Sequence, residues 1–326
     1  MVNLENYVSK AIRDKMKYKS PEELINNTKG IYLRQISSMY SGASIIENLT
    51  GHYNIPFGED GTDWAADLSQ KLTLEEIYYH YTHILTCKRN TFLFKFEKNR
   101  ELIKKYKENI KTQNLFNDYG QPIWDAELPY KPQLWLCHND DEDLDHVSLI
   151  FISKGNFSRF YDVVSHQVQK VYYTGLINCR MHIDDGILAM AIRDYPFNET
   201  SDILAFLNKN FGLNPLAPIE ITDQDIRTFD SHPSVIKTTH EKREGQETTT
   251  ALTRNMEDGD TRNDPLRENI DDREFRLEHG IIDFRGEKLT ISVKKGRCGS
   301  IQFRRYLNPE EHNDAIHRVK RIFGWP

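Results

Sequence analysis

The segment from Met181 to Gly186 places a histidine and two aspartates within four positions. His182, Asp184 and Asp185 are residue types that bind a divalent metal ion, and such an ion could activate water to cleave a phosphodiester. On a strand, however, His182 and Asp184 share one face while Asp185 points to the other, and Asp-Asp-Gly is an ordinary turn sequence. We therefore favour a turn, and keep these three residues as the candidates for a metal-dependent nuclease or phosphodiesterase.

A second group of residues could bind a ligand rather than react with it. Leu289, Ile291 and Val293 alternate with polar residues, and Ile301 and Phe303 continue the pattern after a turn, as half-buried strands do. If this apolar face packs under a helix, the opposite face carries Lys288, Lys294, Gln302, Arg304 and Tyr306, with Arg297 in the turn. Lysine and arginine neutralise phosphates, and tyrosine can stack on a base, so this face predicts a nucleic-acid site. A solvated, lysine-rich sheet edge is the alternative.

Charge is distributed unevenly along the chain, whose formal net charge is -6. Residues 275–326 hold 11 Lys and Arg against 6 Asp and Glu, whereas residues 239–274 hold 6 against 11. Only 5 of the 36 residues in 239–274 are apolar, too few to offset the entropy of ordering the segment. We predict a flexible acidic linker or loop at 239–274, which could compete with phosphate for the basic C-terminal module at 275–326.

The elements that would position these groups begin with a mainly helical region, residues 1–115. Apolar residues at steps of four predict a helix over residues 4–16, and a similar pattern predicts one over 102–110. Ser-Pro-Glu-Glu at 20–23 and Thr-Leu-Glu-Glu at 73–76 are capping boxes, each of which predicts the start of a helix. Residues 91–96 are typical of a strand.

Residues 116–238 form a central α/β region in this interpretation. Apolar runs predict strands over 133–138, 147–153, 176–183 and 186–193, and helices over 157–170 and 201–211. In 275–326 we expect an antiparallel sheet of two or three strands with a helix after the cap at Asn308 packed on one side. The fold class is therefore mixed, α+β or α/β.

The sequence also restricts the class of protein. It holds no apolar run long enough to span a membrane, no signal peptide, and no common nucleotide, hydrolase or zinc-protease motif. Its four cysteines lie far apart, which predicts reduced thiols and no zinc site. We therefore expect no cofactor and a cytoplasmic protein, or a nucleoid or nuclear one if it binds DNA.

The function we favour is nucleic-acid binding, DNA in the first place, without catalytic activity. The metal-dependent hydrolase is one alternative, and a protein interaction scaffold is the other. The 36 Phe, Trp and Tyr residues could also provide anchors for a homo-oligomer or a protein partner.

Overall fold

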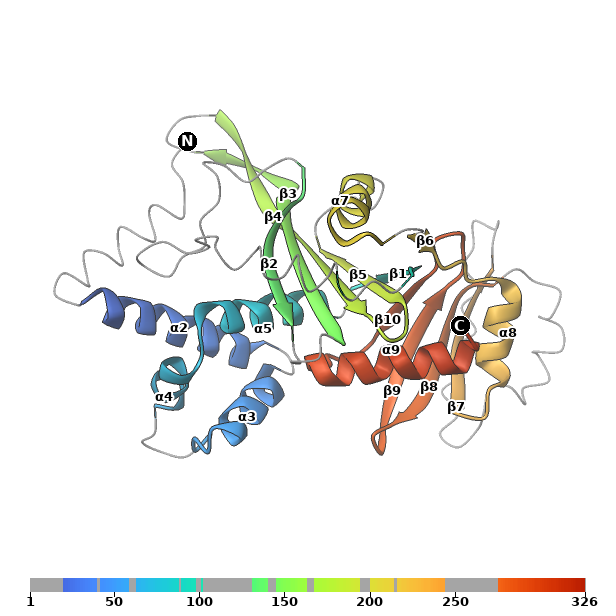
Figure 1. Cartoon of the computed structure of the whole chain (residues 1–326), viewed down its shortest axis with the longest axis horizontal. Coiled ribbons are helices and arrows are strands. Elements are labelled where there is room, and N and C mark those ends of the chain that lie inside the picture. The colour runs from blue at the N-terminus through green and yellow to red at the C-terminus, as the bar shows by residue number, and fades with distance from the viewer. Residues whose placement is uncertain are drawn as a thin grey trace. The chain divides into compact units, whose positions relative to one another are not determined.

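The computed structural model describes the chain in segments, with two compact units that we treat separately (Figure 1). The described residues are 20–39, 42–58, 63–87, 89–97, 101, 131–139, 145–162, 167–193, 200–213, 216–243 and 275–325. The first unit comprises Met1–Tyr81 and Gln113–Ala126, and the second comprises Thr82–Thr112 and Glu127–Pro326. The helices predicted over 4–16 and 102–110 lie outside the described residues.

The first unit is built from helices. They are α2 (Pro21–Ser38), α3 (Gly42–His52), α4 (Trp64–Lys71) and the start of α5 (Leu74–Thr86). Both predicted capping boxes are confirmed: Glu23 N–H donates to Ser20 Oγ, and Thr73 N–H donates to Glu76 Oε2, each with its reciprocal bond. These bonds satisfy amides that a helix start leaves unpaired, so they fix where each helix begins.

The second unit is organised on one sheet, whose described strands run in the order β2-β3-β4-β5-β1-β10-β9-β8-β7, with β6 paired to β1. Every described pairing is antiparallel. The bounds are β1 (Thr91–Lys95), β2 (Gln133–Asn139), β3 (His146–Asp162), β4 (Gln167–His182), β5 (Ile187–Arg193), β6 (Ala217–Pro218), β7 (Val235–Arg243), β8 (Phe275–Phe284), β9 (Glu287–Lys294) and β10 (Ser300–Phe303). The mixed α and β fold class is thus confirmed.

The helix predicted over residues 157–170 is wrong. Its described residues, 157–162 and 167–170, belong to the long strands β3 and β4, which pair from Phe157 opposite Tyr172 to Asp162 opposite Gln167. The segment is rich in valine and aromatic residues, which fit a strand better than a helix because their side chains lose rotamer freedom on a helix. Cross-strand pairing therefore overrides the helical spacing of the apolar residues.

The strands of 275–326 are continuous with those of the central region. β10 lies between β1 and β9, with Thr91 opposite Ile301, so the sheet is larger than the two or three strands expected there. Of the predicted acidic linker, residues 239–243 form the end of β7, and residues 244–274 lie outside the described residues. The flexibility of that segment therefore stays a prediction.

Two similar halves flank β1. The meander β2 to β5 is followed by α7 (Ser201–Phe211), and the meander β7 to β10 is followed by α9 (Pro309–Phe323). Adjacent residues of β1 point to opposite faces: Leu93 packs in the core that includes α9 and α8 (Asp223–Ser231), whereas Phe94 packs in the core of α7. Each half is thus followed by a helix that packs on one of its faces. The other face of β3 and β4 is buried as well, at Ile150, Asn178 and Arg180.

Candidate nucleic-acid interface

Helix α9 decides which face of the C-terminal strands is buried. Its capping box at Asn308 and Glu311 fixes its start, and Gly324, at φ 65°, ends it. The apolar residues of β9 and β10 are all fully buried in the same core as Ile316 and Val319 of this helix. These strand residues are Leu289, Ile291, Val293, Ile301 and Phe303. The predicted burial of this face is confirmed, and strand alternation turns the polar residues between them to the other face.

That other face carries Lys288, Lys294 and Gln302 by strand register, and Arg304 contacts it through Ser292. Arg297 lies in the β9–β10 connection, and Tyr306 follows β10. Lys288, Lys294, Arg297 and Arg304 are exposed, and Gln302 and Tyr306 are half-buried. The register places Lys294 opposite Ser300 and Gln302 opposite Ser292, so these side chains share one face. We call the six residues Lys288, Lys294, Arg297, Gln302, Arg304 and Tyr306 the basic sheet face.

Arg304 is held along this face by a hydrogen bond. Its Nε donates to Oγ of Ser292 at 2.6 Å, and Ser292 is only 2% exposed. Its backbone N–H also donates to the carbonyl of Thr290 at 3.0 Å, which fixes the residue just beyond the end of β10. Because Ser292 lies two positions from Lys294 on β9, the guanidinium and the ammonium belong to the same part of the face.

Some cations of the C-terminal strands and turns form ion pairs with carboxylates, and others do not. Those that pair with carboxylates are Arg285 with Glu310 and Asp314, Lys295 with Asp223, and Arg305 with Glu287 and Glu311. By contrast, Lys288, Lys294 and Arg297 form no ion pair with any acidic residue that the structure describes. Asp283 is the register partner of Lys288 and weakens the field there. Lys294 and Arg297 are therefore exposed cations without a carboxylate partner among the described residues.

The candidate metal residues form the hairpin turn between β4 and β5. Gly186, at φ 62°, donates its N–H to the carbonyl of Ile183 at 3.2 Å, which closes the turn. His182 is 1% exposed and Asp184 lies on the surface, so the turn does not bring these two side chains and Asp185 together. Within the described segments, no three His, Cys, Asp or Glu residues gather in a way that could hold a metal ion.

Asp185 is directed to α9 instead. Its carboxylate contacts Lys320 Nζ at 3.1 Å and His317 Nδ1 at 3.2 Å. Burial by itself raises the pKa of this carboxyl, but the hydrogen bonds with Lys320 and His317 outweigh it and leave the pKa of Asp185 below its ordinary value. Asp185 therefore ties the β4–β5 turn to the helix as a carboxylate.

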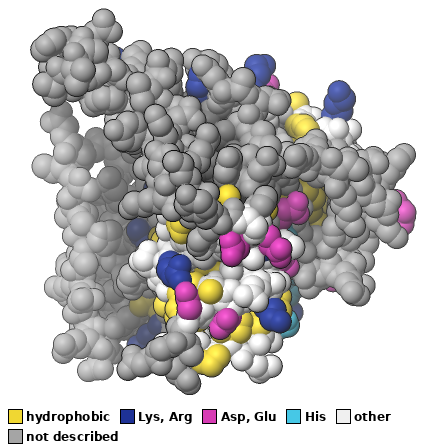
Figure 2. Space-filling view, turned by 90° about the vertical axis from the view of Figure 1, so that its left-hand side faces the viewer, with side chains coloured by type: hydrophobic (Ala, Val, Ile, Leu, Met, Phe, Trp, Pro, Cys, Tyr) yellow, Lys and Arg dark blue, Asp and Glu magenta, His cyan; other side chains and the backbone are white. Residues whose placement is uncertain are grey.

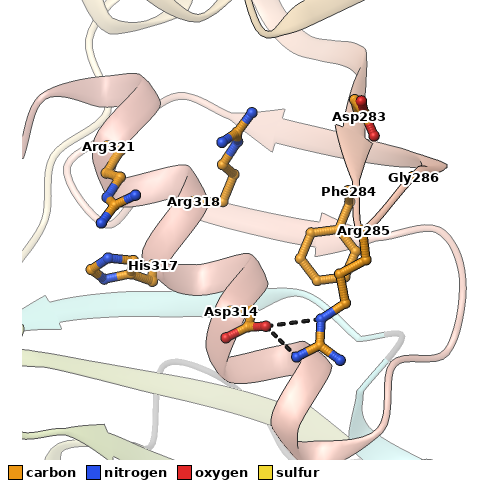
Figure 3. A pocket seen from close by; sticks show the side chains of 8 residues that line it. All are labelled: Asp283, Phe284, Arg285, Gly286, Asp314, His317, Arg318 and Arg321. Atoms are coloured by element: carbon orange, nitrogen blue, oxygen red, sulfur yellow. Dashed lines mark hydrogen bonds and ion pairs between the residues drawn. The ribbon is translucent and has the colours of Figure 1, made fainter.

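A shallow groove of 440 Å³ lies between the β8–β9 turn and α9 (Figure 3). The turn contributes Asp283, Phe284, Arg285 and Gly286, and the helix contributes Asp314, His317, Arg318 and Arg321. Figure 3 shows Arg285 directed at Asp314, and hydrogen bonds with Glu310 and Asp314 raise the pKa of its guanidinium. The two carboxylates among the lining residues offset most of the arginine charge. The groove is thus less positive than the basic sheet face. The sequence analysis did not identify this groove, because the turn and the helix that line it are separate segments of the chain.

A buried arginine that the sequence analysis did not single out joins β4 to α9. Arg180 is 2% exposed, its Nη1 donates to Oγ of Ser148 at 2.9 Å, and its Nε donates to Oδ1 of Asn313. A buried charge is costly unless hydrogen bonds satisfy it, so these contacts are needed to keep α9 in its place.

His312, next to Asn313 in the sequence, lies among other buried histidines and Arg180. His83 Nε2 donates to the carbonyl of Leu307 at 2.8 Å, and the His83 ring lies edge-on to the ring of His312, with 5.7 Å between their centroids. Burial first, and then the neighbouring charges of His83, Arg180 and His182, lower the pKa of His312 well below its ordinary value. All four side chains are buried, so this cluster supports the fold and is not a surface for a large ligand.

Figure 2 shows one face of the molecule. On the face seen there, described acidic, basic and hydrophobic side chains intermingle, and no patch of one charge sign stands out among them.

None of the described helices combines the length and hydropathy that a membrane crossing requires. A scan against protein-family models gives no match, and a search of the curated proteins gives none either. Any functional interpretation therefore rests on the chemistry of the chain itself.

Proposed function

We propose that this protein binds nucleic acid, DNA in the first place, through the basic sheet face, and that it does so without cleaving its ligand. The observation that carries the proposal concerns two exposed cations, Lys294 and Arg297, which form no ion pair with any described residue. Lys294 shares its face with Ser292, which holds the guanidinium of Arg304. A surface that leaves Lys294 and Arg297 without described carboxylate partners, while neighbouring cations form ion pairs, suits a ligand that brings its own negative charges.

The phosphate backbone is the chemistry that fits this surface. Phosphates spaced along a strand can contact several cations at once, and each contact releases a condensed counterion, so binding weakens steeply with salt. Arg304 is already oriented by its bond to Ser292, which reduces the entropy lost when its remaining donors meet a phosphate. The half-buried Tyr306 adds a ring that can stack on a base.

The experiment compares two charge-matched double variants of the full chain. Lys294→Gln with Arg297→Gln removes two of the three cations of the basic sheet face that form no described ion pair, and Lys71→Gln with Lys209→Gln removes two exposed lysines from α4 and α7. Binding of short labelled DNA and RNA is measured by fluorescence anisotropy over a series of salt concentrations. We expect weaker binding and a salt slope shallower by about one unit per lost phosphate contact for the first variant only.

Two outcomes contradict the proposal. If the parent chain binds neither DNA nor RNA at low salt, the proposal is refuted. An equal loss of affinity in both double variants would show that only the net charge of the chain matters. The labelled strands should also stay intact with Mg²⁺, Mn²⁺ or Zn²⁺ present. Cleavage that Asp184→Ala abolishes would instead establish the metal-dependent hydrolase.

A further inference from the structure

The loop that joins β9 to β10 carries Arg297, one of the proposed phosphate contacts. We call residues 295–299 the β9–β10 loop, and the register pair of Lys294 and Ser300 closes it at its base. An arginine on a loose hairpin loop would sample many conformations, and a ligand would have to order them at a cost in affinity. This loop, however, is bonded to a separate part of the chain.

Main-chain hydrogen bonds hold the loop against residues 219–223, which we call the clamp segment. The N–H of Gly296 donates to the carbonyl of Ile221 at 2.9 Å, and the N–H of Ile221 donates to the carbonyl of Gly296 at 3.1 Å. The N–H of Gly299 donates to the carbonyl of Ile219 at 3.0 Å. These bonds flank the arginine of the loop on both sides, so they restrict the backbone that carries it.

A side-chain contact ties the start of the loop to the same segment. Nζ of Lys295 contacts a carboxylate oxygen of Asp223 at 2.7 Å, and the Lys295 side chain is only 19% exposed. Lys294, one position earlier, is exposed. The two successive lysines therefore have different roles, because one is tied to the clamp segment and the other is available on the basic sheet face.

The clamp segment is itself fixed to the sheet. The N–H of Ile219 donates to the carbonyl of Leu93 on β1 at 2.8 Å. Ile221 is 1% exposed and belongs to the core beneath α8 and α9. The capping box of Thr222 and Asp225 starts α8 directly after it. The β9–β10 loop is thus held by a rigid support and not by another mobile loop.

The glycines of the loop fit this close approach. Gly296 has φ 144°, a conformation that L side chains rarely adopt. A Cβ on Gly299 would overlap the side chain of Ile221. Because a larger residue at either position would change the path of the loop, both glycines are needed to keep it on the clamp segment.

We propose that the clamp segment positions Arg297 as a preformed phosphate contact, with Ile221 and Gly299 as the positioning residues; the inference rests on the proposed function. A side chain that is already placed loses less entropy on binding, which corresponds to roughly two- to tenfold in affinity for one flexible side chain. Ile221 and Gly299 carry no charge, so their effect on binding cannot come from the net charge of the chain.

The test uses Gly299→Ala in the full chain, which should displace the loop from Ile221. We expect the affinity for labelled DNA or RNA to fall by roughly two- to tenfold and the salt slope to become shallower by up to about one unit, as Arg297→Gln itself should make it. The matched control is Gly280→Ala, whose Cβ would overlap the buried Phe229 ring elsewhere in the same sheet. It should lower the melting temperature similarly but bind like the parent chain.

Two further measurements separate positioning from unfolding. Gly296→Ala strains only the backbone of the loop, because no atom lies within 4 Å of its new Cβ, and it should weaken binding in the same way. Circular dichroism and the melting temperature establish that each variant is folded at the temperature of the binding assay. In the Arg297→Gln background, Gly299→Ala should have no further effect, since the clamp segment acts through that arginine.

The possible results separate this inference from the proposed function. Absence of binding by the parent chain contradicts the proposed function itself. The inference alone is overturned if Arg297→Gln weakens binding while folded Gly299→Ala and Gly296→Ala bind like the parent. It is also overturned if Gly280→Ala loses as much affinity as Gly299→Ala, or if the loss caused by Gly299→Ala persists in the Arg297→Gln background.

Discussion

The buried histidine cluster beneath α9 predicts a specific loss of stability in acid. His312 is 4% exposed, and burial together with the charges of His83, Arg180 and His182 lowers its pKa well below the ordinary 6.5. In the unfolded chain, His312 takes up a proton near pH 6.5, whereas in the folded chain it stays neutral until a lower pH. The contribution of His312 is therefore fully present above pH 6.5 and is lost as the pH falls toward the lowered, folded-state pKa.

The magnitude follows from proton linkage. For one group, the free energy of unfolding falls by about 1.4 kcal/mol per pH unit in the interval between the two pKa values. A fall of one pH unit within that interval would remove about 1.4 kcal/mol, a noticeable part of the roughly 5–15 kcal/mol that is typical of whole domains.

The matched variant is His312→Gln, which keeps a polar side chain at this position but takes up no proton. Urea unfolding of parent and variant is followed by circular dichroism and tryptophan fluorescence from about pH 8 to about pH 5, and transitions that coincide justify a two-state free energy. The difference between the two proteins should be constant above pH 7 and then change in favour of the variant by about 1.4 kcal/mol per pH unit below 6.5. Parallel curves over the whole range would refute the reasoning.

Three further predictions concern stability and can be measured by the same unfolding experiment. Phe303→Ala should lower the free energy of unfolding by about 3–5 kcal/mol, because the ring is fully buried beneath α9; a cost below 1 kcal/mol would show that the site is not core. Arg304→Ala should cost about 1–2 kcal/mol by removing the donor to the buried hydroxyl of Ser292, and a neutral result would mean that this bond does not orient the arginine in solution. Gly280→Ala should cost about 1–3 kcal/mol, since its new Cβ would meet the Phe229 ring at 2.4 Å, and a stabilised variant would contradict the packing.

The sequence by itself determined the features that depend on neighbouring residues. The capping boxes at Ser20, Thr73 and Asn308 predicted helix starts correctly, because a cap is formed by groups three positions apart. Alternation along β9 and β10 separated the buried residues from the exposed Lys288 and Lys294 for the same reason, since successive side chains of a strand point to opposite faces. This reasoning located most of the basic sheet face without any knowledge of the rest of the chain.

Only the tertiary structure decided which of these groups meet. Residues 157–170 have apolar residues at spacings that a helix or a strand could use, and the pairing of residues 157–162 of β3 with 167–172 of β4 settles the matter in favour of strands. The contact of Asp185 with α9 and the anchoring of Arg304 on Ser292 likewise join positions that local patterns cannot relate. The physical reason is that strand register and helix packing minimise the free energy of the whole chain, so they can depend on residues as distant in sequence as Asp185 and Lys320, which are 135 positions apart. Caps and alternation depend on a single turn or strand.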